Sequence, residues 1–151
     1  MIEAIGHHYV DTYFNKCSEL LAADGMMLLQ AITIADQQYK TALKDVDFIK
    51  RFVFPGCFIP SVTVMQNAVT NSSDMRIFNI EDIGPHYATT LNHWRQNIMQ
   101  SQDRLRALGY NDEFQRMWEF YLCYCEGGFT ERAISDVHML LVKPDNRRAT
   151  L

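Results

Sequence analysis

Residues 26–34 have the sequence MMLLQAITI, and this stretch decides the fold class of the chain. It is an almost unbroken apolar run that ends in the β-branched residues Ile32, Thr33 and Ile34. Apolar side chains at nearly every position favour a strand that is covered on both faces, as in a parallel sheet. Gln30 is the polar exception in the middle of the predicted strand.

The segments on either side of this strand predict helices. Apolar residues at helical spacing run from Val10 to Leu21, and Asp24-Gly25 should end that helix because glycine accepts a left-handed turn. After the strand come a polar stretch over 35–47 and a short amphipathic helix over 48–53. Ser61 should cap the next helix, beyond the bend FPGCFIPS at 54–61.

Two further strands are predicted, MRIFNIEDI at 75–83 and DVHMLLVK at 136–143. Between them GPHY at 84–87 breaks the chain, and a long helix then runs from Tyr87 to Gly109. Another helix runs from a cap at Asn111 or Asp112 to Gly127-Gly128. Strands separated by helices indicate an α/β fold. Three strands make a narrow sheet, so we expect at least one edge to pair with a neighbour.

The composition excludes several classes of protein. A length of 151 residues, with 48% hydrophobic and 21% charged residues, fits one soluble globular domain or part of one. The net charge of −4 offers no basic face for nucleic acid, and no apolar run is long enough to span a bilayer. The chain lacks a signal peptide and a C-x-x-C pair, which favours a cytoplasmic protein with reduced thiols.

Five sequence blocks resemble a known family in their order and spacing. They are MIEAIG, YFNKCSELLAADGMMLLQAIT, FIKRFVFPGCFIPS, EDIGPHYATTLNHWR and RMWEFYLCYCEGGF. Together they resemble the C-terminal portion of the cyclopropane-fatty-acyl-phospholipid synthase family, which includes the mycolic acid cyclopropane synthases. The resemblance extends from Met1 to about Lys143.

The resemblance implies a specific fold. The chain should form the C-terminal half of a Rossmann-like methyltransferase fold dependent on S-adenosylmethionine (SAM). It would contain the last three strands with flanking helices, and the final strand would insert antiparallel between the other two. Residues 1–144 are accordingly assigned to the C-terminal part of a methyltransferase catalytic domain, and residues 145–151 to a flexible tail.

The resemblance also implies an activity. Family members transfer a methylene or methyl group from SAM to the cis double bond of unsaturated phospholipid acyl chains. The expected substrate is therefore an acyl chain at the membrane surface, and the expected location is cytoplasmic or peripheral at the inner membrane face. Cyclopropanation and simple methylation of the alkene both occur among relatives, and the sequence does not separate them.

The SAM site is expected to lie mostly outside this chain. No G-x-G-x-x-G turn follows a strand here, and relatives carry their cofactor loop before the segment that matches MIEAIG. We therefore expect the chain to be inactive alone and to need the N-terminal half of the same enzyme as a partner. The alternative is a non-enzymatic remnant that binds a partner or a membrane surface through its sheet edge. An unrelated small α/β enzyme lacks support, because no nucleophile, metal or phosphate motif is present.

Four residues match the family's site, which holds bicarbonate as the base. By the resemblance Glu3 orients the bicarbonate, Gln30 stands where many relatives have histidine, Ile32 contacts the ion through its backbone, and Tyr87 completes the site. Glutamine can donate a hydrogen bond to an anion but cannot titrate, so a proton relay at Gln30 is not expected. The plainer interpretations are a surface acid at Glu3, a satisfied polar group at Gln30 and a packed aromatic at Tyr87.

Other residues favour structural interpretations. Adjacent His7 and His8 point in different directions on a helix and lack a third ligand at suitable spacing, so we expect no metal site. Aromatic residues near the end of the chain could line a path for the acyl chain, although core packing is the commoner reason for such a stripe. They are Trp118, Tyr121, Tyr124 and Phe129.

Overall fold

The computed structural model describes residues 1–148, which form two compact units. The sheet unit comprises residues 1–82 and the segment from 136 onward, and the helical unit comprises residues 83–135. The sheet unit contains η1 (Ile2–Ala4), η2 (His7–Tyr9), α1 (Val10–Leu20), β1 (Met26–Ile34), α2 (Asp36–Lys44), η3 (Ile49–Val53), α3 (Val62–Ser72) and β2 (Arg76–Asp82). The helical unit contains α4 (Gly84–Gln100), α5 (Gln102–Ala107) and α6 (Asp112–Thr130), and β3 (Ile134–Val142) leads back into the sheet.

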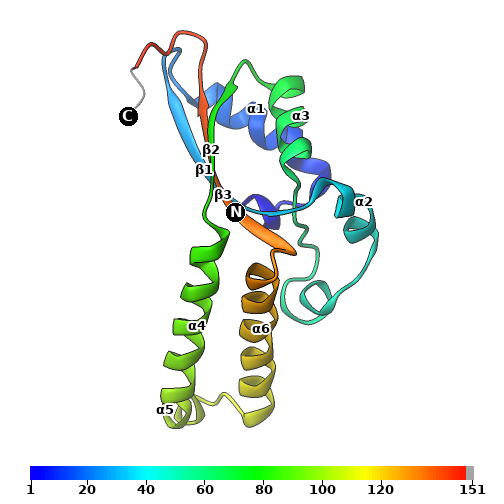
Figure 1. Cartoon of the computed structure of the whole chain (residues 1–151), viewed down its shortest axis with the longest axis vertical. Helices are drawn as coiled ribbons and strands as arrows, with labels where there is room; N and C mark the ends of the chain where they lie inside the picture. Colours follow the sequence, from blue (N-terminus) through cyan, green and yellow to red (C-terminus); the bar gives the residue numbers. More distant parts are fainter. Residues whose placement is uncertain (149–151) are drawn as a thin grey trace. The chain divides into compact units, whose positions relative to one another are not determined.

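The sheet has the strand order β1-β3-β2 (Figure 1). β3 runs antiparallel to β2, with Arg76 opposite Val142 and Asp82 opposite Val137. Beyond β3 the N–H groups of Lys143 and Asp145 donate to the carbonyl oxygens of Gly25 and Ala23, at 3.0 and 3.2 Å. The residue numbers rise from 143 to 145 on the β3 side while they fall from 25 to 23 on the β1 side, so these segments run antiparallel. The predicted α/β class and the insertion of an antiparallel final strand are therefore confirmed.

One face of the sheet is covered and the other is largely open. Helices α1 and α3 lie side by side against the covered face (Figure 1). The core between them contains Phe14, Met65, Ala31, Met139 and Leu141. Burial alternates along β1, so that Leu29, Ala31 and Thr33 are buried while Leu28 and Gln30 are exposed. The predicted coverage of this strand on both faces is wrong for this chain, because an apolar run reports burial propensity and does not identify the partner that buries it.

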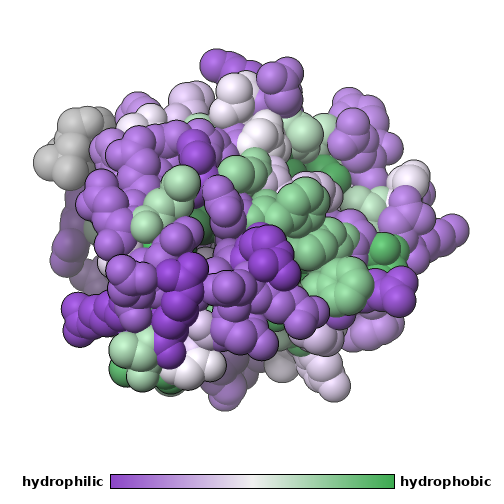
Figure 2. All heavy atoms as spheres, turned by 90° about the horizontal axis from the view of Figure 1, so that it is seen from below, coloured by the Kyte–Doolittle hydropathy of each residue, from purple (hydrophilic) through white to green (hydrophobic). Residues whose placement is uncertain are grey.

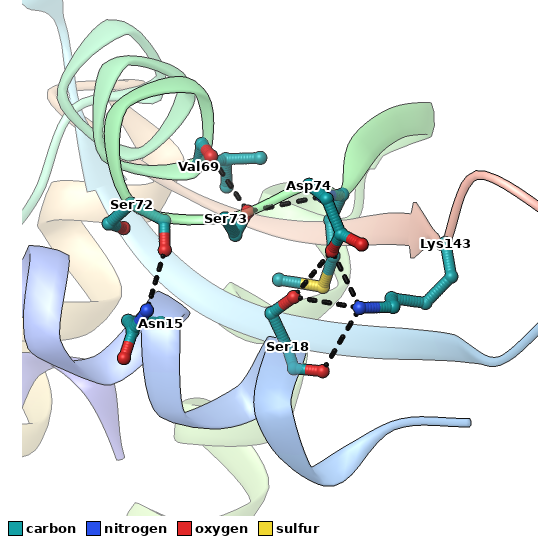
Figure 3. A network of polar contacts seen from close by, with 8 residues as sticks. Asn15, Ser18, Val69, Ser72, Ser73, Asp74 and Lys143 are labelled. Carbon is teal, nitrogen blue, oxygen red and sulfur yellow. Dashed lines mark hydrogen bonds and ion pairs between the residues drawn. The ribbon is translucent and has the colours of Figure 1, made fainter. Parts of the chain in front are cut away.

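A network of polar contacts connects α1, the loop before β2 and the residue after β3 in the sheet unit (Figure 3). The ammonium group of Lys143 donates to the carbonyl oxygen of Ser18 at 3.2 Å and to Asp74 Oδ1 at 2.6 Å. The Ser18 hydroxyl donates to the same Asp74 oxygen at 2.6 Å, and Asn15 donates to the carbonyl of Ser72 at 3.0 Å. The Lys143 and Ser18 contacts connect α1 and the loop before β2 to the end of β3, and the Asn15 contact connects α1 to the end of α3.

The start of the predicted tail has specific contacts. Asn146 is 7% exposed, and its side-chain amide donates to the carbonyl of Asp24 at 2.7 Å. Residues 145–148 thus lie within the described structure, while 149–151 of the predicted tail lie outside the described residues. The boundaries 1–144 and 145–151 stay predictions.

One predicted helix end and one stretch without a predicted helix differ from the structure in the first half of the chain. Gly25 does not have the left-handed conformation expected of it; α1 already ends at Leu20, and a Cβ at Gly25 would lie 2.9 Å from the carbonyl oxygen of Ala22. The glycine is thus explained by close approach of the backbone. The polar stretch at 35–47, for which no helix was predicted, contains α2, whose Tyr39 and Leu43 pack on the core four residues apart. Two apolar residues are too few to show the helical periodicity from which α2 could have been predicted.

The second half shows similar differences. GPHY opens α4 and does not break the chain, because Pro85 occupies the first helical turn, where its missing N–H costs nothing. The expected long helix is divided at Ser101 into α4 and α5. Helix α6 begins at the Asn111 cap, whose Oδ1 accepts the N–H of Phe114 at 2.9 Å, and it continues through Gly127-Gly128 to Thr130.

The helical unit is a hairpin in which α4 and α6 run side by side, joined by α5 (Figure 1). Glu126 of α6 forms polar contacts with α4, accepting from Asn92 at 2.8 Å and from Arg95 at 3.3 Å. No helix within residues 1–148 combines the length and apolarity needed to cross a membrane. Large exposed apolar side chains remain, and Figure 2 shows apolar groups (green) gathered in a patch surrounded by hydrophilic ones (purple).

Candidate functional site

Glu3 is held in place by the backbone around it. The neighbouring Ile2 is fully buried in the core and anchors η1, and the N–H of Phe58 donates to the Glu3 carbonyl at 3.1 Å. The side chain is 22% exposed, and its Oε1 accepts the N–H of Ile32 on β1 at 2.8 Å. Its Oε2 accepts from the α-amino group of Met1 at 2.9 Å. The carboxylate thus lies against β1 in a fixed position.

Gln30 lies two residues before Ile32 on β1, so both side chains lie on the open face of the sheet. The amide Nε2 of Gln30 donates to Oδ2 of Asp136, on the adjacent strand β3, at 2.6 Å. The structure therefore brings together three of the four predicted residues, Glu3, Gln30 and Ile32, and adds Asp136 to them.

Asp136 has an unusual environment for a carboxylic acid. It is 0% exposed, and its Oδ1 has no hydrogen-bond partner within the described part of the chain. Burial raises the pKa of Asp136 above its ordinary value, and the charges of Glu3 and Asp82 add to this shift. The hydrogen bond from Gln30 and the charge of His138 act in the opposite direction. Burial disfavours the ionised form, so this carboxyl retains its proton to a higher pH than an exposed aspartate.

Tyr13 belongs to the same neighbourhood, although the sequence suggested only a core position for it. Burial raises the pKa of the Tyr13 phenol to about 12, with further contributions from the Cys17 charge, a hydrogen bond to Cys17 and the Glu3 charge. Tyr13 therefore stays protonated at neutral pH. A signal for Asp136 was available, since an acid at the start of an apolar strand is unexpected. No comparable signal marked Tyr13.

Tyr87 lies in the first turns of α4, in the helical unit. Its ring centroid is 4.9 Å from that of Phe129 and 6.1 Å from that of Trp94. These contacts set the position of the ring within the hairpin. A common site of Tyr87 with Glu3 and Gln30 stays a prediction of the family resemblance.

The predicted aromatic stripe is divided among different neighbours. Trp118 stacks on Phe114 at a centroid distance of 5.7 Å and lies tilted against Tyr121 at 4.9 Å. Tyr124 instead lies 6.1 Å from Phe120, and the buried Phe129 contacts Tyr87. A path for the acyl chain along these residues stays a prediction.

The His7–His8 pair and Cys57 are possible ligands or reactive groups by residue type, and the structure shows their surroundings. The rings of His7 and His8 are 3.7 Å apart, and burial, His8 and Lys50 lower the pKa of His7. Burial raises the pKa of the half-buried Cys57 thiol, as does the charge of Asp47. Within residues 1–148, no group of three His, Cys, Asp or Glu residues is arranged to hold a metal ion.

The residues gathered in the sheet unit do not by themselves make a cradle for bicarbonate. The N–H of Ile32 is donated to Glu3, and one N–H of Gln30 is donated to Asp136. An anion placed here would meet the carboxyl groups of Glu3 and Asp136, and would find few donors. The arrangement is better suited to a developing positive charge, which a fixed carboxylate stabilises.

Comparison with known proteins points to one family. The family model described as mycolic acid cyclopropane synthetase matches residues 1–139. Tuberculostearic acid methyltransferase from Mycobacterium tuberculosis is 36% identical over 129 residues, covering 85% of this chain and 30% of the relative. The cyclopropane-fatty-acyl-phospholipid synthase of Escherichia coli (strain K12) is 32% identical over 137 residues, covering 89% and 33%.

Solved structures agree with this comparison. A mycolic acid cyclopropane synthase in complex with SAH and CTAB superposes with a TM-score of 0.82 at 27% identity, covering 94% of this chain and 52% of that one. A cyclopropane synthase from Mycobacterium tuberculosis has the same fold, with a TM-score of 0.83 at 23% identity. The chain thus spans about a third of the length of these curated relatives and about half of that structure.

Proposed function

The chain belongs to the mycolic acid cyclopropane synthetase family, and on that premise we propose that it supplies the C-terminal part of a SAM-dependent methyltransferase. The proposed substrate is the cis double bond of an unsaturated phospholipid acyl chain. The product is either a cyclopropane or a methyl branch, since the relatives include a cyclopropane-fatty-acyl-phospholipid synthase and a tuberculostearic acid methyltransferase. The proposed location is cytoplasmic, at the membrane surface that contains the substrate.

One observation carries the proposal: the Glu3 carboxylate is fixed on the N–H of Ile32 at 2.8 Å, beside Gln30 on the open face of the sheet. When SAM is bound it supplies an electrophilic methyl group. The alkene then gains positive charge, and a fixed negative carboxylate lowers the energy of that state without any reorganisation. The neutral Gln30 amide can orient groups nearby without adding a charge that titrates.

Closure of a three-membered ring must also release one proton from the methyl carbon. The carbon–hydrogen electron pair forms the new carbon–carbon bond, and the proton passes to a base. Bicarbonate as that base stays a prediction of the resemblance, because the Ile32 N–H and one N–H of Gln30 already donate to carboxyl groups and leave few donors for an anion. Tyr87 is the predicted residue that could add one, through its hydroxyl group.

The SAM-binding residues are proposed to come from a segment outside this sequence, since no G-x-G-x-x-G turn occurs in it. The proposed partner is the N-terminal half of the same enzyme type. A complementation assay tests this. The chain is mixed with the N-terminal part of the Escherichia coli relative, labelled SAM and vesicles that contain oleoyl phospholipid. Mass spectrometry of the released fatty acids separates cyclopropane from methyl-branched products.

We expect label in the acyl chains only when both parts are present. The two halves of the Escherichia coli enzyme, expressed separately, provide the positive control. Transfer by that control pair but not by the mixture would refute the proposed activity. Calorimetric titration of the chain alone with SAM adds an independent check, because tight binding would show that the cofactor site has been assigned to the wrong segment.

A non-enzymatic binding role is favoured by one observation. Leu28 and Phe78 are 61% and 41% exposed on β1 and β2, which is unusual for strand residues of this size. Such a surface would suit a protein partner or a membrane. If the mixture fails in the transfer assay while the chain still co-purifies with the N-terminal part, this second role replaces the first.

A further inference from the structure

Asp136 stands out among the titratable groups because it is fully buried and is not matched to any predicted role. It lies near the start of β3, directly beside Gln30 of β1, and its Oδ2 accepts from the Gln30 amide at 2.6 Å. Gln30 itself is exposed. A buried acid is thus bonded to the exposed polar group that the proposed function assigns to the site.

The contact selects one orientation of the Gln30 amide. Oδ2 carries no proton either in the carboxylate or in the acid protonated on Oδ1, so it can only accept a hydrogen bond, and the NH2 end of the amide faces it. The carbonyl oxygen and the second N–H of Gln30 then point in directions that are fixed as well. Without this contact the amide could rotate by half a turn and exchange its donor for its acceptor.

The second carboxyl oxygen of Asp136, Oδ1, indicates which protonation state is compatible with a buried hydrogen bond between Oδ2 and Gln30. Oδ1 has no partner in the described residues, and an isolated ionised oxygen in such a place is costly. A proton on Oδ1 removes that charge and leaves Oδ2 as the acceptor for Gln30. The charged or titratable groups around Asp136 are Glu3 from η1, Asp82 from β2 and His138 from β3. Two of these are acidic and therefore favour the protonated form.

We propose that Asp136 is a positioning residue that locks the Gln30 amide in one orientation toward the acyl chain. This inference rests on the proposed function, since it is the site of that reaction that Gln30 would serve. Asp136 does not touch the substrate in this role; it acts through Gln30. Its effect should therefore disappear when the Gln30 amide is removed.

A double-mutant cycle in the complemented enzyme tests this inference. Asp136→Ala and Gln30→Ala should each lower kcat by about tenfold or more, because misplacement of a site group by about 1 Å can have an effect of this order. The double variant should be no slower than Gln30→Ala alone. Asp136→Asn keeps an acceptor oxygen, so it should recover most of the rate lost in Asp136→Ala. Thermal unfolding of each variant identifies losses that come from misfolding.

Nuclear magnetic resonance of the isolated chain gives a readout that needs no methyl transfer. The side-chain amide protons of Gln30 should shift with the same pH midpoint as the carboxyl carbon of Asp136, and that midpoint should lie above the ordinary aspartate range. In Asp136→Asn this pH-dependent shift should be absent. Amide signals that ignore the Asp136 titration would overturn the proposal.

The outcomes separate the two levels of inference. Asp136→Ala could lower the rate by the same factor in the unaltered enzyme and in the Gln30→Ala variant. That result would show that Asp136 acts independently of Gln30, and it would overturn the positioning role but not the proposed function. An unaltered enzyme that transfers no methyl group would refute the proposed function, whatever the amide signals show. The positioning role at a catalytic site would fall with it, while a matching titration would still establish the contact as a structural one.

Discussion

At the scale of single residues, the proposed site depends on how two acids are held. Glu3 is partly exposed and is fixed by a backbone N–H, whereas Asp136 is fully buried and has one unpartnered oxygen. The two carboxyl groups therefore differ in the environment that sets their charge. In enzymes such differences allow neighbouring acids to have different roles.

Glu3→Gln should lower the turnover of the complemented enzyme by roughly a hundredfold, because it removes the negative charge beside the reacting alkene. The amide oxygen of glutamine can still accept the N–H of Ile32, so the fold should be preserved. The measurement is kcat together with the unfolding midpoint. Glu19→Gln is a matched control, since Glu19 is an exposed acid paired with Lys16 on the surface of the sheet unit. Equal rates for both variants would exclude a role for the Glu3 charge.

Tyr87→Phe should lower turnover by about tenfold, because it removes the hydroxyl group that the resemblance assigns to the site. The ring keeps its contacts with Phe129 and Trp94, at 4.9 and 6.1 Å, so only the hydroxyl is lost. Tyr110→Phe is the control, because Tyr110 is an exposed tyrosine whose ring contacts Phe114 in the same unit. A Tyr87→Phe enzyme with full rate would place Tyr87 outside the site.

At the scale of elements, helix ends depend on the space around particular glycines. Gly127 lies exposed within α6, and a Cβ there would meet nothing within 4 Å. Gly25 stands before β1, where a Cβ would lie 2.9 Å from the Ala22 carbonyl oxygen. Both glycines looked like helix stops in the sequence, but only their surroundings show what each one does.

Gly127→Ala should therefore stabilise the protein by about 0.5–1 kcal/mol, because alanine loses less backbone entropy on forming a helix. Gly25→Ala should destabilise it by about 1–3 kcal/mol, because the backbone must shift to admit the methyl group. Urea unfolding of the two variants beside the unaltered chain measures both effects. A destabilised Gly127→Ala variant would mean that α6 ends at Gly127, as the sequence alone indicated.

At the scale of the whole molecule, the chain leaves the sheet after β2 and returns to it as β3. The Lys143 network then fixes the end of β3 to segments from the first half of the chain, Ser18 and Asp74. Lys143 is buried, so the contact with Asp74 also satisfies its charge. The native arrangement of the sheet unit thus depends on an ion pair that responds to pH.

Stability should fall as the pH drops below about 4. The hydrogen bonds from Lys143 and from Ser18 lower the pKa of Asp74 below its ordinary value. The unfolded chain then takes up this proton at a higher pH than the folded one, so the stabilisation is complete above the unfolded pKa and disappears as the pH falls through the folded pKa. Unfolding free energies of the unaltered chain and of Asp74→Asn, measured from pH 6 to pH 2.5, should converge at low pH. Parallel curves would show that Asp74 does not contribute to the acid response.

The sequence by itself determined the three strands, the α/β class and the Ser61 and Asn111 caps. It could do so because apolar periodicity and capping are local properties that neighbouring residues reveal. The resemblance added the order of the strands and named Glu3, Gln30, Ile32 and Tyr87. The apolar pattern of β1 did not reveal that one face of this strand is exposed, since an apolar run does not say which side is covered.

Only the tertiary structure decided that Asp136 faces Gln30 and that Glu3 rests on Ile32. These pairs are separated by 106 and 29 positions in the chain, so no local pattern links them. The pairing of β1 with β3 sets the first contact, and the burial of Ile2 sets the second. The charge state of a buried acid follows from the same pairing, because desolvation depends on neighbours that the folded chain brings together.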